Sequence, residues 1–342
     1  MKFEKKKILD SEILKINLPK LNNISDRELF KFELSRKINE VNIYKIKDLS
    51  LSKKGVPLVF HGNIIKDFLK FNSLSKLILF KKIVLYLNYA TLFIRNYKKN
   101  ILKSNIIILH DRHSENYFHW ITDVLPKIFW LKEKRFLNSK ILLPNFKNTF
   151  QKKTLNLITK KYFLNKNNKN LQIKKAYYIS EFHPSGVPRL KYLLKTRNFF
   201  LKKFNCKYGN QKTYISRKFS ERRRLYNEIE LIEELRKKNF KILYMENLSF
   251  KQQVIESAKS KIIISVHGAG LTNLIWMKKK SKIIEFRDES DINLNPYYVL
   301  CQRLKLDYNY FFTQKGIFNK INQHYDYKLN VNDFIKKYES IL

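Results

Sequence analysis

The second half of the chain alternates short apolar runs with stretches whose apolar residues recur at helical spacing. The runs that predict strands lie at residues 212–216, 241–245, 262–266 and 282–286. Between them, residues 227–240 predict a helix that is capped by Asn227. Ser249 with Gln252 forms a capping box before a further helix. Strands and helices that alternate at these lengths predict an α/β fold, in which helices cover a parallel sheet.

The first half of the chain predicts a second, separate core. Its strand-like runs lie at residues 56–60, 82–87, 106–109, 140–143 and 176–180. A chain of 342 residues, 44% of them hydrophobic, can bury two cores, and residues 205–211 with Gly209 predict the hinge between them. The expected organisation is a domain of residues 1–204, a second of residues 205–327, and a terminal helical segment, 328–342, that can return to the first.

A glycine loop directly follows one predicted strand. The strand at residues 262–266 runs into the sequence HGAG (267–270), and a short helix-like segment follows. The chain has seven glycines, and two of them stand two positions apart here. Glycine lets the backbone turn sharply and approach a ligand closely, and the N–H groups at the start of a helix favour an anion such as phosphate. A tight turn without a ligand is the simpler alternative.

Two known motifs compete for this glycine loop. A dinucleotide fingerprint needs a third glycine where Asn273 stands, and it opens a fold instead of lying near the end of the chain. The oxyanion loop of α/β-hydrolases also contains His-Gly, but its partner, the nucleophile elbow Gly-x-Ser-x-Gly, occurs nowhere in the sequence. What remains is a phosphate-facing loop inside a βα unit.

Polar residues stand at the ends of three predicted strands. They are the tripeptide Ser216-Arg217-Lys218, His267 and Glu285. Ligands of parallel sheets bind beyond the carboxyl ends of the strands, so these residues are expected to meet at one edge of the sheet. By analogy with the acid that binds ribose in dinucleotide folds, Glu285 can hold nucleotide ribose hydroxyls, and an ordinary strand-end charge is the alternative.

Several collinear blocks of the sequence resemble one known family. YISRKFSERRRLYNEIELIEEL, then FKQQVIESAKSKIIISVHGAGLTNLIWM, then KIIEF are similar to the catalytic core of glycosyltransferase family 61. Upstream, NYFHWITDVLPKIFWL resembles the other recurring block of the family, with His119, Trp120 and Asp123 in matching places. The resemblance covers about residues 105–310, in order and with compatible spacing.

The resemblance implies an inverting glycosyltransferase of GT-B architecture, in which two Rossmann-like domains face each other across a cleft. It also implies a nucleotide-sugar donor as substrate, no further cofactor and no metal. The sequence agrees, since it has no Asp-x-Asp motif and the acidic run at 288–291 has the wrong spacing for a metal clamp. The residues expected to bind the nucleotide sugar are Arg217, Lys218, His267, Gly268, Ala269, Gly270, Leu271, Thr272, Asn273 and Glu285.

An inverting transfer is a single displacement, so a base must take the proton from the acceptor hydroxyl. His119 and Asp123 stand four residues apart in a helical segment and are expected to share one face. Asp123 is the preferred base because a carboxylate is ionised at neutral pH, and His119 can position it or the sugar. A semi-buried histidine and a solvated helix carboxylate without catalytic roles are the alternatives.

Charge opens a second interpretation of function. The chain has 70 Lys and Arg against 29 Asp and Glu, a formal net charge of +41, which would attract nucleic acid, anionic lipid or acidic polymers. The alternative function is therefore a basic binding protein for nucleic acid or another polyanion on a Rossmann-like scaffold. Nucleic acid is not the expected partner, because the lysines are spread along the chain and no known nucleic-acid-binding module is recognisable.

Two cysteines, Cys206 and Cys301, are too few for a disulfide framework or a Cys-x-x-Cys metal site. The first twenty residues lack the apolar core of a secretory signal, and no window predicts a membrane span. Together with the resemblance, this predicts a cytoplasmic enzyme of bacterial type with peripheral contact to the anionic inner membrane face. The expected acceptor is a glycan or lipid-linked glycan in capsule, lipopolysaccharide or exopolysaccharide assembly.

Overall fold

The chain forms two compact units in a computed structural model. The first unit consists of Met1–Glu12 and Asn39–Pro184, and the second of Ile13–Ile38 and Ser185–Leu342. The structure describes residues 3–51, 100–111, 113–136, 139–146, 149–165, 171–184, 186–289, 295–319 and 324–342. The predicted strands at 56–60 and 82–87 lie outside these residues. Among the described residues, no helix has the length and hydropathy needed to cross a bilayer.

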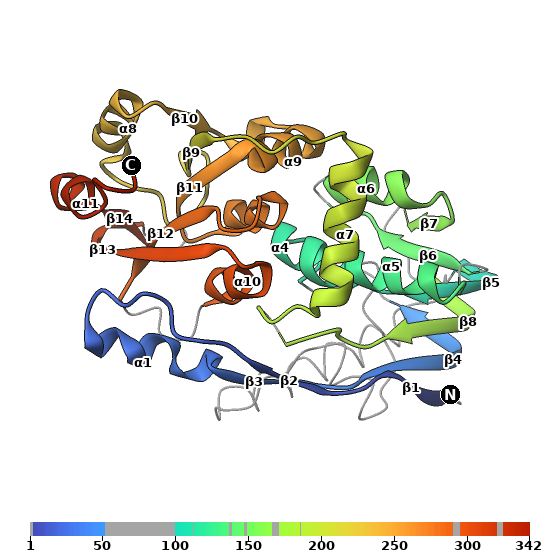
Figure 1. Cartoon of the computed structure of the whole chain (residues 1–342). Helices are drawn as coiled ribbons and strands as arrows, with labels where there is room; N and C mark the ends of the chain where they lie inside the picture. The colour runs from blue at the N-terminus through green and yellow to red at the C-terminus, as the bar shows by residue number, and fades with distance from the viewer. Residues whose placement is uncertain are drawn as a thin grey trace. The chain divides into compact units, whose positions relative to one another are not determined.

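The first unit is built on a mixed six-stranded sheet (Figure 1). Its strands, in spatial order, are β1 (Phe3–Leu9), β4 (Val41–Leu51), β8 (Leu171–Ile179), β5 (Asn100–Ile108), β6 (Lys140–Pro144) and β7 (Tyr162–Asn165). The four strands from β8 to β7 run parallel, whereas β4 is antiparallel to both β1 and β8. The sheet is therefore only partly of the parallel type expected for a Rossmann-like domain.

In the described part of the first unit, helices connect the parallel strands. They are α4 (Tyr117–His119), the π-helical turn η3 (Trp120–Val124), α5 (Leu125–Glu133) and α6 (Phe150–Ile158). The first three lie between β5 and β6 in the chain, and α6 lies between β6 and β7. The strands predicted at 106–109, 140–143 and 176–180 are confirmed as parts of β5, β6 and β8. Their carboxyl-terminal ends differ from the predicted ones by one residue, whereas β5 and β8 begin several residues earlier than predicted.

The second unit contains the predicted parallel sheet. Its strands are β9 (Gln211–Ile215), β10 (Phe240–Leu243), β11 (Ser260–Val266), β12 (Lys282–Asp288), β13 (Asp307–Asn319) and β14 (His324–Lys328). The spatial order is β10-β9-β11-β12-β13-β14, and all neighbouring pairs are parallel except β13 with β14. The first five strands thus follow the doubly wound order 2-1-3-4-5, whose topological switch point lies between β9 and β11.

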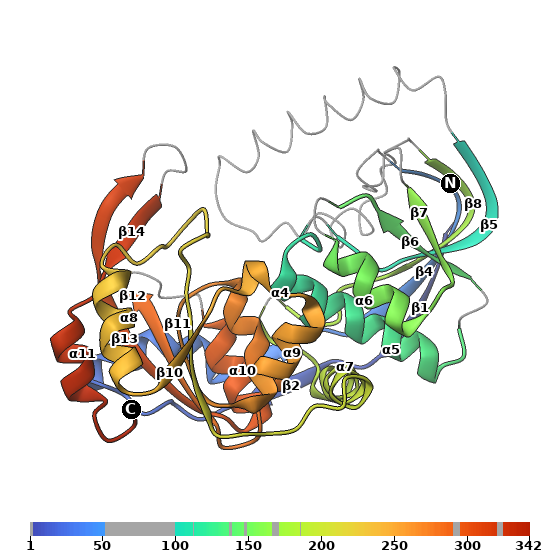
Figure 2. The same cartoon turned by 90° about the horizontal axis from the view of Figure 1, so that it is seen from above.

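Helices cover both faces of this sheet (Figure 2). They are α7 (Leu190–Lys203), α8 (Glu228–Lys237), η4 (Met245–Asn247), α9 (Phe250–Lys259), the 3-10 helix η5 (Ala269–Trp276), α10 (Pro296–Leu304) and α11 (Val331–Lys337). Helices α8 and α11 lie on one face, and α9 and α10 on the other. The capping box of Ser249 and Gln252 before α9 is confirmed. Asn227 is the N-cap residue of α8 as predicted, but its side chain makes no capping hydrogen bond and instead bonds the backbone of Leu329.

Helix α7 belongs to the second unit, so the predicted boundary at residue 204/205 lies inside that unit. The Phe200 ring packs against Phe250 and Trp276, with centroids 4.9 and 5.9 Å away. Arg197 reinforces this contact by donating from Nε to the Ile275 carbonyl at 2.6 Å. These buried contacts attach α7 to α9 and η5, whereas the residues after it lead directly into β9.

Two further segments pack on the second unit: residues 13–38, which were expected in the first domain, and the C-terminal segment, for which a return to the first domain was one expectation. The segment 13–38 carries η1 (Ile24–Asp26), α1 (Arg27–Phe30), η2 (Lys31–Glu33), β3 (Ser35–Ile38) and most of β2 (Glu12–Lys15). Its Phe30 is fully buried against Tyr298 and Tyr310. In α11, Phe334 packs on Phe286, with centroids 4.8 Å apart. Aromatic side chains buried in the core of the second unit therefore hold both segments there.

Candidate active site

Two strand ends meet at the switch point of the second unit. Arg217 comes shortly after β9 and Gly268 shortly after β11, and β9 and β11 are neighbouring parallel strands. A Cβ on residue 268 would lie 1.8 Å from Nη1 of Arg217 and 2.5 Å from its Cζ. The backbone of Gly268 is extended (φ 167°, ψ 172°), a conformation open to any residue. The glycine therefore makes room for the guanidinium lying against it, which an added Cβ would displace, and no sharp turn calls for it.

The Arg217 side chain is held by a turn of its own loop. Its Nε donates to the carbonyl of Arg223 at 3.1 Å and its Nη2 to that of Arg222 at 2.6 Å. The third nitrogen, Nη1, is the one that lies against Gly268. Burial lowers the pKa of Arg217, and the nearby phenol of Tyr297 opposes that shift. Because arginine starts from so high a pKa, the group remains a cation at neutral pH.

Glu228 holds the same loop through hydrogen bonds, and the sequence analysis did not identify this residue. Its buried carboxylate accepts hydrogen bonds from Tyr214 Oη at 2.8 Å, Ser216 Oγ at 2.9 Å and the backbone N–H of Arg217 at 3.1 Å. Burial, together with this carboxylate, raises the pKa of Tyr214 well above its ordinary value. The one available signal was an acid in the first turn of the helix that follows Ser-Arg-Lys.

The glycine loop itself opens η5. The first backbone bond of the turn runs from Leu271 N–H to Gly268 O at 2.9 Å, so the N–H groups of Ala269 and Gly270 precede it and can face an anion. Leu271, Thr272 and Asn273, the last three residues of the predicted stretch 267–273, are buried. Lys218, by contrast, is exposed.

Asn273 supports the loop from inside. Its Nδ2 donates to Gly270 O at 3.1 Å and to Gln253 at 3.2 Å, and its Oδ1 accepts from Trp276 at 3.0 Å. A side chain engaged in this way shapes the loop instead of reaching a ligand. Of the predicted stretch 267–273, the first four residues therefore remain the candidates to face a ligand.

Glu285 lies behind His267 and does not face a ribose. One carboxylate oxygen pairs with Nδ1 of His267 at 2.5 Å, the other accepts from Tyr308 Oη at 2.5 Å, and the side chain is fully buried. Burial alone would raise the pKa of Glu285, but the charge and hydrogen bond of His267, with Arg287 and Tyr308, lower it overall. With Nδ1 turned to the carboxylate, Nε2 of His267 is the nitrogen that can meet a ligand.

The lowered pKa of Glu285 also links this pair to stability. A carboxylate whose pKa is depressed by folding contributes stability above the ordinary carboxyl pKa, and the contribution is lost as the pH falls through the lowered value. The His267–Glu285 pair is therefore fully formed at neutral pH. At that pH the Glu285 carboxylate is ionised and holds the Nδ1 side of the His267 ring.

In the first unit, a π-helical turn lies within the helix that carries the predicted base. Helix α4 begins after Asn116, whose side chain accepts from Phe118 N–H at 2.8 Å, and then passes into η3 and α5. Pro126 has no N–H for the carbonyl of Thr122, one turn earlier, and Nε2 of His183 lies 2.8 Å from that oxygen instead. A π-helical turn holds more residues than an α-helical turn, so a spacing of four no longer guarantees a shared face.

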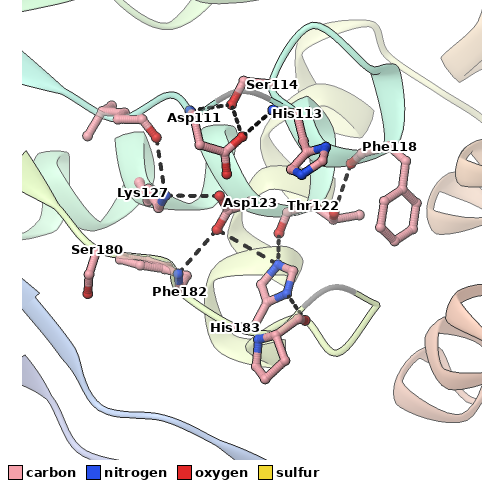
Figure 3. Close-up of polar contacts among 12 residues, drawn as sticks. Asp111, His113, Ser114, Phe118, Thr122, Asp123, Lys127, Ser180, Phe182 and His183 are labelled. Atoms are coloured by element: carbon pink, nitrogen blue, oxygen red, sulfur yellow. Dashed lines mark hydrogen bonds and ion pairs between the residues drawn. The ribbon is translucent and has the colours of Figure 1, made fainter. Parts of the chain in front are cut away.

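Asp123 is buried in a network of charged and polar groups (Figure 3). It and Lys127 are each 2% exposed, and Nζ of Lys127 donates to Asp123 Oδ2 at 2.9 Å and to the Leu109 carbonyl at 3.1 Å. The other oxygen of Asp123 accepts from the backbone N–H of Phe182 at 3.2 Å and lies 4.0 Å from Nε2 of His183. The carboxylate thus joins the π-helical turn to the segment after β8.

His119 occupies a more open position than Asp123. It is half-buried, and its ring lies beside that of His113, with centroids 5.2 Å apart and planes inclined by 30°. The loop that carries His113 is fixed by Asp111, which accepts from the His113 N–H at 2.7 Å and from Ser114 Oγ at 3.1 Å (Figure 3). Sequence reasoning missed His113, which precedes the recognised block.

Residues 117–284 match the sequence profile of the family described as Glycosyltransferase 61. The match begins in α4 and ends in β12, so it spans the π-helical turn, Arg217 and the glycine loop. The chain belongs to glycosyltransferase family 61. In a comparison with curated proteins, no protein matches it.

The match places most of the site of this glycosyltransferase within the family region. His119, Asp123, Arg217 and Gly268 lie inside it, whereas Glu285 lies just beyond its end. The region is narrower than the expected 105–310 but carries both recurring blocks. Within the described parts of the chain, no group of three or more His, Cys, Asp or Glu side chains could hold a metal ion; the acidic run at 288–291 is described only at Asp288 and Glu289.

Proposed function

We propose that this glycosyltransferase is an inverting enzyme of GT-B type that transfers a sugar from a nucleotide sugar to a glycan or lipid-linked glycan acceptor. The proposal extends to the bacterial assembly of capsule, lipopolysaccharide or exopolysaccharide in the cytoplasm. The observation that carries it is the Arg217 guanidinium lying against Gly268 at the switch point of a doubly wound sheet. Sheets of this kind bind their ligands at that point.

The donor diphosphate fits the chemistry of this position. It carries negative charge, and Arg217 can offer planar, charge-assisted hydrogen bonds to its oxygens. His267, Ala269 and Gly270 follow the same strand, β11, and Nδ1 of His267 pairs with Glu285; in this proposal Nε2 of His267 and the N–H groups of Ala269 and Gly270 are the further donors. In the transfer, the bond between the sugar and the diphosphate breaks, and these donors stabilise the charge that develops on the leaving oxygen.

The acceptor hydroxyl needs a base, and among the predicted pair His119 fits this role better than Asp123. Asp123 already accepts from Lys127 and from the backbone of Phe182, and it is 2% exposed. Taking a proton there would leave the buried ammonium of Lys127 without its counter-charge. His119 is half-buried and can accept a proton at neutral pH. In this proposal Asp123 anchors the helix and His119 takes the proton.

Binding of nucleoside diphosphates tests the donor assignment. UDP, GDP or dTDP, or CMP for a CMP-sugar donor, is expected to raise the melting temperature, since a ligand at about 100 times its Kd stabilises by about 2.7 kcal/mol. The measurement is a thermal-shift series, with the matching nucleosides as controls that lack phosphate. An absence of any shift, or an equal shift with the nucleosides, would contradict a diphosphate site.

Metal independence is the second expected property. The sequence offers Arg217 in place of an Asp-x-Asp clamp, so the leaving diphosphate is neutralised by protein groups. Turnover measured in excess EDTA is expected to equal turnover in untreated enzyme. Activity that disappears with the chelator and returns with added Mn²⁺ would instead assign the acidic run at 288–291 to a metal.

A further inference from the structure

The donor site has one closed side. Next to the glycine loop, β12 carries Glu285 and Arg287, both fully buried, and α10 carries Tyr297, which is also buried. The rings of His267 and Tyr297 meet edge to face, with centroids 5.1 Å apart. The protein's own side chains thus pack the β12 side of the glycine loop, which favours the opposite side for a nucleoside attached to a diphosphate at Arg217.

The opposite side, toward β10, presents an aromatic ring to solvent. Phe219 is 54% exposed, although a phenylalanine normally buries most of its apolar surface. A turn closed by Ser220 N–H to Arg217 O at 2.9 Å brings Phe219 next to Arg217. The same turn thus carries both the cation of the phosphate site and an exposed ring.

A second aromatic residue supports the exposed ring. Tyr244, directly after β10, lies with its centroid 5.5 Å from that of Phe219 at an interplanar angle of 58°. The next residue, Met245, lies close to the glycine loop, since its Cγ would be 3.9 Å from a Cβ on Gly270. The ring pair is therefore adjacent to the phosphate site, one strand further along the sheet, and Lys218 Nζ lies 5.9 Å from the Phe219 centroid.

We propose that Phe219 is the stacking platform for the nucleobase of the donor, with Tyr244 behind it. This inference rests on the proposed function, because it places the base of the nucleotide whose diphosphate Arg217 binds. Every nucleobase offers a π face, so stacking confers affinity with little preference among bases. Selectivity for one base must then come from other groups.

Comparing the affinity of a nucleotide with that of pyrophosphate separates the contribution of the base from that of the phosphates. Calorimetric titration of UDP, GDP and pyrophosphate at one ionic strength is the measurement. Phe219→Leu keeps the apolar volume but removes the π face. It is expected to lower the affinities for UDP and GDP by a similar factor, about 5- to 100-fold. Pyrophosphate affinity is expected to stay unchanged, and Phe219→Tyr is expected to bind all three ligands as the wild type does.

Tyr226→Leu is the matched control. Tyr226 lies in the same loop and is 63% exposed, but its backbone N–H bonds Tyr327 O of β14, away from the switch point. Its substitution is expected to change none of the three affinities. Nucleotide binding by Phe219→Leu at wild-type affinity would overturn the platform, and so would an equal loss for pyrophosphate. A wild-type protein that binds neither pyrophosphate nor nucleotide would overturn the proposed function beneath it.

Discussion

Alanine at position 268 is expected to weaken donor binding by about 10- to 100-fold, the worth of about one charge-assisted hydrogen bond. The new Cβ would stand 1.8 Å from Nη1 of Arg217, so the guanidinium must leave its place. The extended backbone at this position accepts alanine without strain. Titration of a nucleoside diphosphate into Gly268→Ala measures the loss, and a melting curve confirms that the variant is folded.

A double-mutant cycle identifies the cause of that loss. If Gly268 serves only to make room for Arg217, then Gly268→Ala in an Arg217→Ala background is expected to cost nothing further. Gly270→Ala is the matched control, because its Cβ would lie 3.2 Å from the Ile215 side chain and away from Arg217. Losses that add in the double variant would show that the glycine makes room for the phosphate itself, as the sequence alone suggested.

Removal of the His119 imidazole is expected to lower turnover by about 10²–10⁴-fold, the usual contribution of a general base. The ring is half-buried and borders His113, so its loss leaves the packing of α4 largely intact. Donor affinity and melting temperature of His119→Ala are expected to match those of the wild type. Steady-state turnover, together with nucleotide titration on the same preparation, separates catalysis from binding.

Asp123→Asn provides the contrast with His119→Ala. The substitution keeps the shape of the side chain but leaves the Lys127 ammonium buried without its counter-charge, which is expected to cost about 3–5 kcal/mol of unfolding free energy. Denaturant unfolding measures this cost. An Asp123→Asn variant that is as stable as the wild type but has lost turnover would return the role of base to Asp123.

The parallel sheet of the second unit was predictable because its strands are covered on both faces. Such strands carry nearly continuous apolar runs, as residues 262–266 do, and these stand out from the helical stretches between them. Parallel direction alone then places the ends of β9 and β11 at the same edge. The meeting of Arg217 and the glycine loop therefore followed from the sequence, although its geometry did not.

The roles of individual side chains depended on contacts that local patterns do not encode. Glu285 ends a strand in the manner of a ribose ligand, but β12 lies beside β11 and α10 covers it, so both carboxylate oxygens are taken by His267 and Tyr308. Spacing of four predicted one shared face for His119 and Asp123. The π-helical turn at residues 120–124, just before Pro126, holds more residues than an α-helical turn, so this spacing no longer implies a shared face.

By itself, the sequence determined the α/β class, the family and the candidate residues of the site, because periodicity, capping and collinear motifs are properties of short stretches. Only the tertiary structure decided that Arg217 is the reason for Gly268, that Asp123 is an anchor bound to Lys127, and that residues 13–38 belong with the second unit. Each of these depends on side chains that become neighbours only when elements distant in the chain pack together and exclude water from between them.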